Sequence, residues 1–474
     1  MRKKIWPLML LSGLLTSCSL TPPYQPPAVD IPCAWHSKVS GALCVGTPED
    51  FLWWESLHDP ILDSLITRAW QGNFDLSIAA TRILEARGLQ KGSDAYLYPH
   101  LDGSMNYAHA EYNKQVVNRL FCGDCCSDKG GSRRSVDLFE VGFDAEWEID
   151  LFGMHAHEAS ALKAKVESSQ AEFCHVWITL SAEVARVYIE LRSAQQQLQV
   201  IENDLAAQSE SLHITNGLIQ AGFLSTVDQW QAEEQLQHMI AQKPLLQLSI
   251  YKAIHRLSIL LGQLPGDLFA ELSVATALPC LPCQAPIGIP AELLRRRPDI
   301  VQAERELAAA AEMEASAVAA LFPRLSLRGF VGEIGTALVT GSFAWWAGPQ
   351  LLLPIFNSRL LEQDVYLNQV KARRALYEYQ QAVLLALEEA ENAIAAFSSE
   401  LGRNQALFQA QKASQEAYDL TLQLYHQGMR NYLEVLARDR SLLVTKKAYL
   451  ESQSELIFHY IALYKVLGGC WCVP

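Results

Sequence analysis

Long apolar runs are missing from this chain of 474 residues once its first segment is passed. A helix that crosses a bilayer needs about 20 consecutive apolar residues, so no transmembrane helix is expected. Basic residues are also in short supply, with 38 lysines and arginines against 52 aspartates and glutamates and a formal net charge of −14. Because this balance provides no basic face for phosphates, nucleic acid is excluded as a partner.

Motifs that carry catalysis are absent as well. The chain has no glycine-rich phosphate loop, no nucleophile elbow and no paired carboxylates in a supporting context. His155 and His157 lack the HExxH spacing and do not share a helix face, so they predict no metal site. We therefore expect no enzymatic activity, no catalytic residue, no metal and no cofactor.

Cysteine, by contrast, is plentiful, with 11 in the chain. Cys280 and Cys283 form a CxxC pair, a spacing shared by redox motifs, zinc sites and local disulfides. In an exported, proline-rich loop we favour a disulfide. Three more cysteines lie in a loop at 121–131, which leaves its role and the disulfide connectivity open. Cys174, on a predicted helix, is expected to be buried.

The N-terminal segment predicts export. Basic residues at 2–4 precede an apolar run that is too short to span a bilayer and ends in small residues, the pattern of a signal peptide over 1–17. Leu-Thr-Ser-Cys at its end resembles the lipobox of bacterial lipoproteins, which would leave Cys18 as the first residue with a covalent lipid. Ser19 favours the outer membrane, and 18–50 would form a lipidated leash. The alternative is an ordinary signal peptide with an incidental cysteine.

A weak internal repeat divides the rest of the chain into 51–265 and 266–474. Each half is predicted to hold a helix, a β-hairpin and a long helical hairpin. The β-hairpins are predicted at about 97–152 and 322–356, and the helical hairpins at about 155–262 and 358–468. Gly222 and Gly428 mark the turns of the helical hairpins, and Pro244 is expected to kink the first returning arm. Arms of about 60 residues, at about 1.5 Å per residue, predict a rod or a tube.

The first β-hairpin alternates apolar and polar residues. From Phe139 to Ile149 every second residue is apolar, and those between are acidic or glycine. A soluble sheet would bury the apolar face, whereas a membrane barrel would turn it to lipid and line a wet lumen with the acidic face. Two hairpins supply about four strands and a closed barrel needs at least about eight, so the membrane interpretation requires an oligomer.

Short motifs along almost the whole chain resemble one family. They occur at Cys18-Ser19-Leu20, Trp53-Trp54, Asp59-Pro60, Asn73 to Leu76, Trp147 to Gly153, Arg296 to Ile300, Leu321-Phe322-Pro323 and Leu463 to Gly469. In this order and spacing, the chain resembles the TolC-type outer-membrane efflux proteins, in the lipoprotein branch paired with resistance-nodulation-division (RND) pumps.

The resemblance implies a mainly α fold with a membrane β-barrel portion. A homotrimer with four strands per chain would form a twelve-stranded barrel, continued by a long α-helical barrel through the periplasm. The implied partners are a periplasmic adaptor (membrane fusion) protein, an inner-membrane RND-type pump and outer-membrane lipid. The implied function is export of drugs or other small molecules. The alternatives are a duct for type I protein secretion and a structural coiled-coil envelope lipoprotein without a pore.

The family places its constriction at the periplasmic tips of the helical hairpins. The matching residues are Gly222, Ser225, Thr226, Val227, Asp228, Gly428, Asn431, Tyr432, Leu433 and Arg440. Ala437 stands where the family carries a pore-facing aspartate, which puts a ring of carboxylates in doubt, and Asp439 is turned about 200° around the helix from it. We expect closure to rest on an apolar ring from Leu433, with Val227 as a further candidate, and on pairing of Arg440 with a neighbouring carboxylate. The alternative is that Leu433 is only a coiled-coil seam residue. The acidic run at 388–391 is expected to be a solvated helix face.

Overall fold

The computed structural model describes residues 24–28, 31–32, 34–37, 43–45, 52–113, 133–222, 225–282, 285–287, 289–336, 339–356 and 358–468. The chain divides into two compact units, and each draws on both halves of the sequence repeat. The strand unit consists of Met1–Pro27, Leu84–Glu167 and Glu304–Tyr377, and the hairpin unit of Ala28–Ile83, Ser168–Ala303 and Glu378–Pro474. The boundaries of the two units therefore differ from those of the sequence repeat, because each unit contains equivalent elements from both halves.

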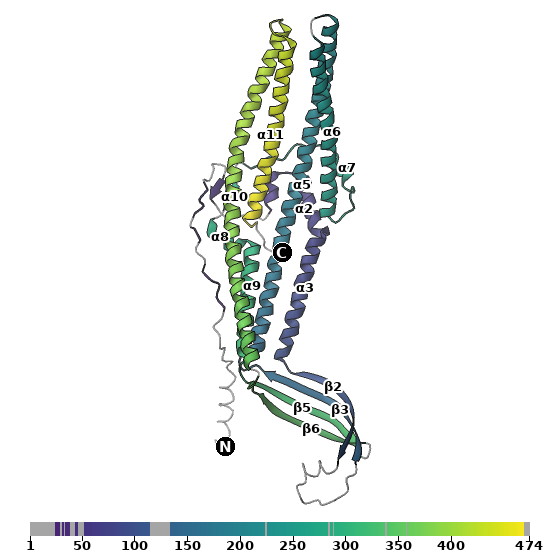
Figure 1. Ribbon diagram of the computed structural model, residues 1–474, viewed down its shortest axis with the longest axis vertical. Helices are drawn as coiled ribbons and strands as arrows, with labels where there is room; N and C mark the ends of the chain where they lie inside the picture. The colour runs from purple at the N-terminus through teal and green to yellow at the C-terminus, as the bar shows by residue number, and fades with distance from the viewer. Residues whose placement is uncertain are drawn as a thin grey trace, which may run out of the picture. The chain divides into compact units, whose positions relative to one another are not determined.

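The strand unit contains a four-stranded antiparallel sheet in the order β2-β3-β5-β6 (Figure 1). Its strands are β2 (His100–Asn113), β3 (Arg133–Ile149), β5 (Arg324–Thr336) and β6 (Val339–Leu352). The two hairpins join through β3 and β5, with Gly142 opposite Gly332. Since β2 and β6 lie at the edges of the sheet, each has one side without a partner strand in the described chain.

The two faces of this sheet differ in chemistry. One face carries exposed apolar side chains, among them Met105, Val141, Phe143, Phe343 and Trp345. On the other face, Glu146 Oε1 accepts a hydrogen bond from Arg328 Nη2 at 2.6 Å, and Asp144 Oδ2 accepts one from Ser104 Oγ at 2.5 Å. The alternation predicted from the sequence is confirmed by the strand register.

Phe330 is a large apolar residue on the polar face of the sheet, and it is only 3% exposed. Its ring lies close to two glycines, one on β3 and one on β5. A Cβ on Gly142 would lie 2.6 Å from the ring, and one on Gly332 would lie 2.7 Å from it. The paired glycines therefore make the space that this ring fills.

Four long helices form two helical hairpins (Figure 1). They are α5 (Met154–Gln220) with α6 (Thr226–Leu260), and α10 (Ser358–His426) with α11 (Tyr432–Val466). Gly222 and Gly428 lie in the turns with φ angles of 82° and 77°, in the left-handed region that glycine tolerates. α6 continues through Pro244 as one helix. None of the described helices is apolar over a length that would cross a membrane.

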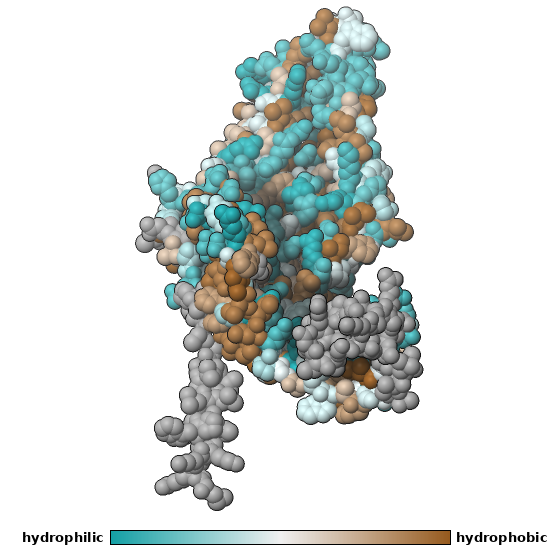
Figure 2. Space-filling model, turned by 60° about the horizontal axis from the view of Figure 1, so that its bottom comes forward, coloured by the Kyte–Doolittle hydropathy of each residue, from teal (hydrophilic) through white to brown (hydrophobic). Residues whose placement is uncertain are grey.

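Shorter elements surround these hairpins. The helices are η1 (Trp53–Leu57), α2 (Pro60–Gly72), α3 (Phe74–Asp94), η2 (Ala95–Leu97), α7 (Phe269–Leu272), α8 (Pro290–Arg296) and α9 (Pro298–Ala319). In the hairpin unit, β1 (Leu43–Val45) pairs in parallel with β4 (Ala285–Ile287), which ties the N-terminal segment to the second half of the chain. The space-filling view shows apolar surface gathered in the lower half of one face, whereas the surface nearer the hairpin tips is mostly polar (Figure 2).

The main core lies in the hairpin unit around a cluster of aromatic rings. Trp53 stacks on Tyr464 with ring centroids 5.8 Å apart, and Trp70 stacks on Trp177 at 4.5 Å. Trp54 bridges the two pairs, at 5.7 Å from Trp53 and 5.3 Å from Trp70. The Trp-Trp motif therefore joins the segment before α2 to α5 and α11.

The ends of α2 and α6 meet backbone to backbone. A Cβ on Gly262 would lie 2.1 Å from the carbonyl oxygen of Gly72, and one on Gly72 would lie 2.3 Å from that of Leu261. Asn73 supports the contact by donating its side-chain amide to the Leu260 carbonyl at 2.9 Å. This approach is open only to glycine at both positions.

We expect Gly262→Ala to lower the melting temperature of the protein more than Gly266→Ala. Both glycines have positive φ angles, 70° and 100°, but only the first has a neighbour that an added Cβ would strike. The difference between the variants isolates the steric term, which is about 1–3 kcal/mol for overpacking. Thermal unfolding of the detergent-solubilised protein measures it, and equal shifts in the two variants would contradict the contact.

Candidate functional site

The two hairpin tips carry the residues matched to the family's constriction. Asn431 caps α11, because its Oδ1 accepts a hydrogen bond from the Glu434 backbone N at 3.0 Å. Arg430 Nη1 pairs with Glu434 Oε2 at 2.7 Å across one helical turn. At the other tip α6 begins at Thr226, preceded by the exposed Ser225. Val227 is 60% exposed, and the side chain of Asp228 lies outside the described part of the structure.

Tyr432 lies at the tip, and its side chain points into the protein. It is 8% exposed, its hydroxyl is hydrogen-bonded to Ser211 Oγ of α5, and its ring lies 5.3 Å from that of Tyr425. Burial raises the pKa of Tyr432. The residue therefore connects the start of α11 to α5 and α10 and holds the second turn in place.

Leu433, Ala437 and Arg440 follow one side of α11 at spacings of four and three residues. Leu433 is half-buried, whereas Ala437 and Arg440 are exposed. Asp439 is turned away from this side, as the helix geometry predicts, and is in part buried. Asp439 therefore does not replace the missing carboxylate, and Arg440 places a positive charge on the Leu433 side of the helix.

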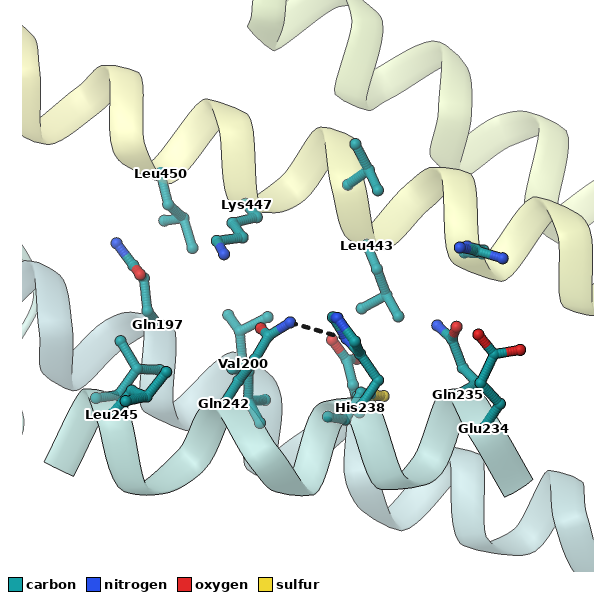
Figure 3. A pocket seen from close by; sticks show the side chains of 16 residues that line it. Gln197, Val200, Glu234, Gln235, His238, Gln242, Leu245, Leu443, Lys447 and Leu450 are labelled. Carbon is teal, nitrogen blue, oxygen red and sulfur yellow. Dashed lines mark hydrogen bonds between the residues drawn. The ribbon is translucent and has the colours of Figure 1, made fainter. Parts of the chain in front are cut away.

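A cavity of about 320 Å³ lies beside Arg440, between α5, α6 and α11 (Figure 3). In Figure 3, Leu443 and Lys447 of α11 face His238 and Gln242 of α6 across it. Gln242 Nε2 lies 3.1 Å from His238 Nδ1. The remaining lining is mixed: Gln197, Val200, Ile201, Asp204, Glu234, Gln235, Met239, Leu245, Leu246, Val444 and Leu450. The cavity therefore lies between the two helical hairpins of one chain, and both polar and apolar side chains line it.

Two carboxyl groups lie close to this cavity. Asp204 of α5 lines it, and Asp439 of α11 is near enough to Asp204 to interact with its charge. Burial raises the pKa of Asp439, the Asp204 carboxylate raises it further, and Lys446 opposes both. Burial also raises the pKa of Asp204, again against Lys446. Tyr418 of α10 and Tyr432 face Asp439 as well. The packing of α5 on α11 therefore includes like charges that are incompletely compensated.

Asp439→Asn is expected to stabilise the protein at neutral pH. A carboxyl whose pKa is raised by folding contributes stability that is complete in acid and is lost as the pH rises through the folded-state pKa. The gain in melting temperature should therefore shrink as the pH falls towards about 4, the ordinary pKa of aspartate. Thermal unfolding across a pH series tests this, with the exposed Asp419→Asn as control. A loss of stability at neutral pH would contradict it.

A second arrangement, which we call the arginine clasp, joins two of the motifs found in the sequence. Arg297 is 7% exposed and pairs with Asp299 through both Nε and Nη2, at 3.0 and 2.6 Å. Nη2 also bonds to Glu389 at 2.6 Å, and Nη1 donates to the Val466 carbonyl at 3.3 Å. One side chain thus links the start of α9 to α10 and to the end of α11.

Gly468 completes the arginine clasp. Its φ angle is 87°, and a Cβ there would lie 2.9 Å from the Arg296 carbonyl oxygen and 3.1 Å from the Arg297 nitrogen. The Arg-Arg-Pro-Asp and Leu-Gly-Gly motifs therefore form one contact, although about 170 residues separate them in sequence. The sequence contains both motifs but gives no signal that they meet.

The acidic run on α10 is in part the solvated face that the sequence predicts, since Glu388 and Glu389 are exposed, but it also makes contacts with distant segments. Glu389 is held by Arg297 at 2.6 Å, and Glu391 accepts hydrogen bonds from the backbone N of His36 and Ser37 at 2.7 and 2.9 Å. These bonds lower the pKa of Glu391 against the effect of its partial burial. Glu389 is exposed, as the sequence predicts, but it also binds Arg297, whereas Glu391 is in part buried because the segment at 36–37 lies against the helix.

The remaining residues singled out in the sequence are the histidine pair at 155 and 157 and several cysteines. His157 Nδ1 lies 2.6 Å from Glu312 Oε2, and in the part of the chain that the structure describes no group of acidic, histidine or cysteine side chains is arranged to hold a metal. Cys174 is buried, as predicted, and burial raises the pKa of its thiol to about 11. Cys280 is exposed. Cys18, Cys283 and the loop at 121–131 lie outside the described residues, so the lipid and the disulfide stay predictions.

A sheet with one apolar and one polar face, combined in one chain with two long helical hairpins, defines the architecture of the TolC-like channels. Residues 65–263 and 289–469 match the family described as outer membrane efflux protein. The chain belongs to this family, and the resemblance noted from its motifs is confirmed.

Similar proteins and structures agree with this assignment. The chain is 31% identical over 492 residues to the solvent efflux pump outer membrane protein SrpC of Pseudomonas putida, covering 100% of this chain and 99% of that protein. It is 27% identical over 466 residues to the cation efflux system protein CusC of Escherichia coli, covering 96% of each. The structure of the outer-membrane channel OprN matches with a TM-score of 0.86 at 30% identity, over 96% of this chain and 100% of that one.

Proposed function

We propose that this protein is the outer-membrane channel of a tripartite efflux system, which carries small molecules from the periplasm to the exterior. The observation that supports it most directly is the sheet, whose apolar face suits lipid and whose polar face suits a wet lumen. The length of the helical hairpins suits a tube. Relatives named for solvent and for cation efflux support small solutes as the cargo.

The sheet edges favour a trimer. Backbone groups at the edges of β2 and β6 must be paired in lipid, and one chain cannot close its four strands on themselves. If β6 of each chain pairs with β2 of the next, three chains give twelve strands, enough for a closed barrel. Native mass spectrometry of the protein extracted in a mild detergent should show a trimer. A folded monomer as the single species would refute this assembly.

A periplasmic adaptor and an inner-membrane pump of the RND type are the proposed partners. Two other functions, a type I secretion duct and a poreless coiled-coil lipoprotein, fit less well. A poreless rod has no use for a sheet with an apolar outer face. The relatives named for solvent and for cation efflux favour efflux over protein secretion.

A lipid on Cys18 is the proposed anchor of the N-terminus. Cys18→Ala should abolish labelling by radioactive palmitate and slow removal of the signal peptide, because the thiol is the acceptor for the lipid. Equal labelling of the wild type and the variant would exclude the anchor. Membrane fractionation is a poor test, since an inserted barrel holds the variant in the membrane as well.

A further inference from the structure

Arg192 of α5 is buried far from the hairpin tips and away from the arginine clasp. Its side chain is 0% exposed. Its Nη1 donates to Gln195 Oε1 and to the Val274 carbonyl, each at 2.7 Å, and the guanidinium also interacts with the Tyr188 hydroxyl. Gln195 in turn donates to the Leu272 carbonyl at 2.7 Å, which fixes the loop after α7 against the helix.

The other edge of the guanidinium lacks partners. Within the described residues, Nε and Nη2 are buried and donate to no acceptor. The face of the group lies over the Tyr188 ring, with Cζ 4.9 Å from the centroid, which compensates part of the charge but none of these N–H groups. Buried charges in proteins are ordinarily paired. The unpaired Nε and Nη2 groups of Arg192 therefore suggest that a ligand binds here.

Asp59, the carboxylate that binds Tyr188, is engaged with other groups. Tyr188 donates its hydroxyl to Asp59 Oδ2 at 2.6 Å, and Asp59 Oδ1 caps α2 by accepting from the Ile61 and Leu62 backbone nitrogens at 3.0 and 3.3 Å. Burial and the Asp59 bond raise the pKa of Tyr188 to about 12, so it stays a neutral donor. Asp59 thus faces the tyrosine and its own helix, and no ion pair joins it to Arg192 in the described chain.

The free edge has the geometry of an anion site. Nε and Nη2 form the fork with which arginine binds two oxygens or one small anion by parallel charge-assisted hydrogen bonds. Two more buried polar atoms without a described partner belong to residues nearby in sequence: Gln196 Oε1, one helical turn after Arg192, and Thr276 Oγ1, two residues after Val274. A hydroxyl donates to an anion, and an amide that is turned over does so too.

We infer that Arg192 forms an internal binding site for a small monovalent anion, either a halide or a short carboxylate. Because the side chain has no exposed surface, the occupant must be small and must enter through local opening of the loop after α7. The anion neutralises the buried guanidinium and fastens α5 to that loop and, through Tyr188 and Asp59, to the start of α2. The site is independent of the proposed passage and of its gate.

Bromide tests the inference without any variant. Crystals of the full-length protein soaked in sodium bromide should show an anomalous peak within hydrogen-bond distance of Arg192 Nε and Nη2 in every chain. Peaks at the protein surface alone, or a water without anomalous signal at Arg192, would overturn the site. Parallel soaks in formate and chloride distinguish a carboxylate from a halide.

Stability measurements give a second, independent readout. At constant ionic strength, replacing gluconate by chloride or formate should raise the melting temperature of the wild type, and Arg192→Met should abolish this rise. Arg186→Met is the matched control, because Arg186 is an exposed arginine on the same helix, paired with Glu183 at 3.0 Å. If the wild type shows no dependence on the small anion, the inference is wrong even when Arg192→Met fails to fold.

Discussion

Leu433→Ala is expected to raise the resting conductance of single channels several-fold. In the trimer three copies of this residue would form an apolar ring at the hairpin tips. Leu433 is half-buried, and the carboxylate expected one turn further on is replaced by Ala437. Truncating the leucine removes the apolar barrier without exposing a new charge. Recordings at fixed voltage in symmetric salt measure the effect.

The control for this prediction is another leucine of α11. Leu442 is only 3% exposed and is therefore a packing residue. Leu442→Ala should lower stability by about 2–5 kcal/mol and leave conductance unchanged. Ala437→Asp should add a ring of carboxylates and make the current sensitive to divalent cations. If Leu433→Ala destabilises the trimer as Leu442→Ala does, with unchanged conductance, then Leu433 is a seam residue and the gate lies elsewhere.

Arg297→Met is expected to lower the stability of the protein. It leaves Asp299 and Glu389 without their common partner and removes the bond to the Val466 carbonyl. Glu389 is more than half exposed and can be hydrated, so the cost falls mainly on the partly buried Asp299 and the Val466 carbonyl, at about 1–3 kcal/mol for acceptors left without a partner. We expect a large drop in melting temperature and a reduced yield of trimer.

The neighbouring arginine provides the control. Arg296→Met removes a weaker pair, with Glu292 at 3.6 Å, and should change stability by less than about 1 kcal/mol. A double-mutant cycle with Glu389→Gln measures the interaction energy between Arg297 and Glu389 apart from the loss of packing. In the Arg297→Met background, the second substitution should recover part of the lost stability. If Arg297→Met and Arg296→Met have equal effects, the arginine clasp does not hold the three helices together.

The fold class could be predicted because its signals are local. The alternation from Phe139 to Ile149 reports directly on the two faces of a strand, and the glycines at 222 and 428 report on turns between long helices. The inward direction of Asp439 also follows from helix geometry, since two residues turn the side chain by about 200°. Each of these inferences needs only residues near one another in the sequence.

The contacts that hold the chain together could not be predicted, because they join distant segments. Arg297 reaches Glu389 and Val466, and Glu391 reaches the backbone of Ser37. In the sequence, Glu389 and Glu391 look like any exposed acidic residues on a helix. Glycines with a packing role, such as Gly142 under the Phe330 ring, look like flexible positions until the strand register is known.

Single-channel recording of the purified protein in a planar lipid bilayer tests the central claim most directly. We expect stepwise current increases of uniform size, each from one trimer, and a preference for cations that follows from the acidic face of the sheet and the net charge of −14. Ala437→Asp should strengthen that preference. Protein that inserts as a trimer yet carries no current under any voltage, with Leu433→Ala equally silent, would contradict a transport channel.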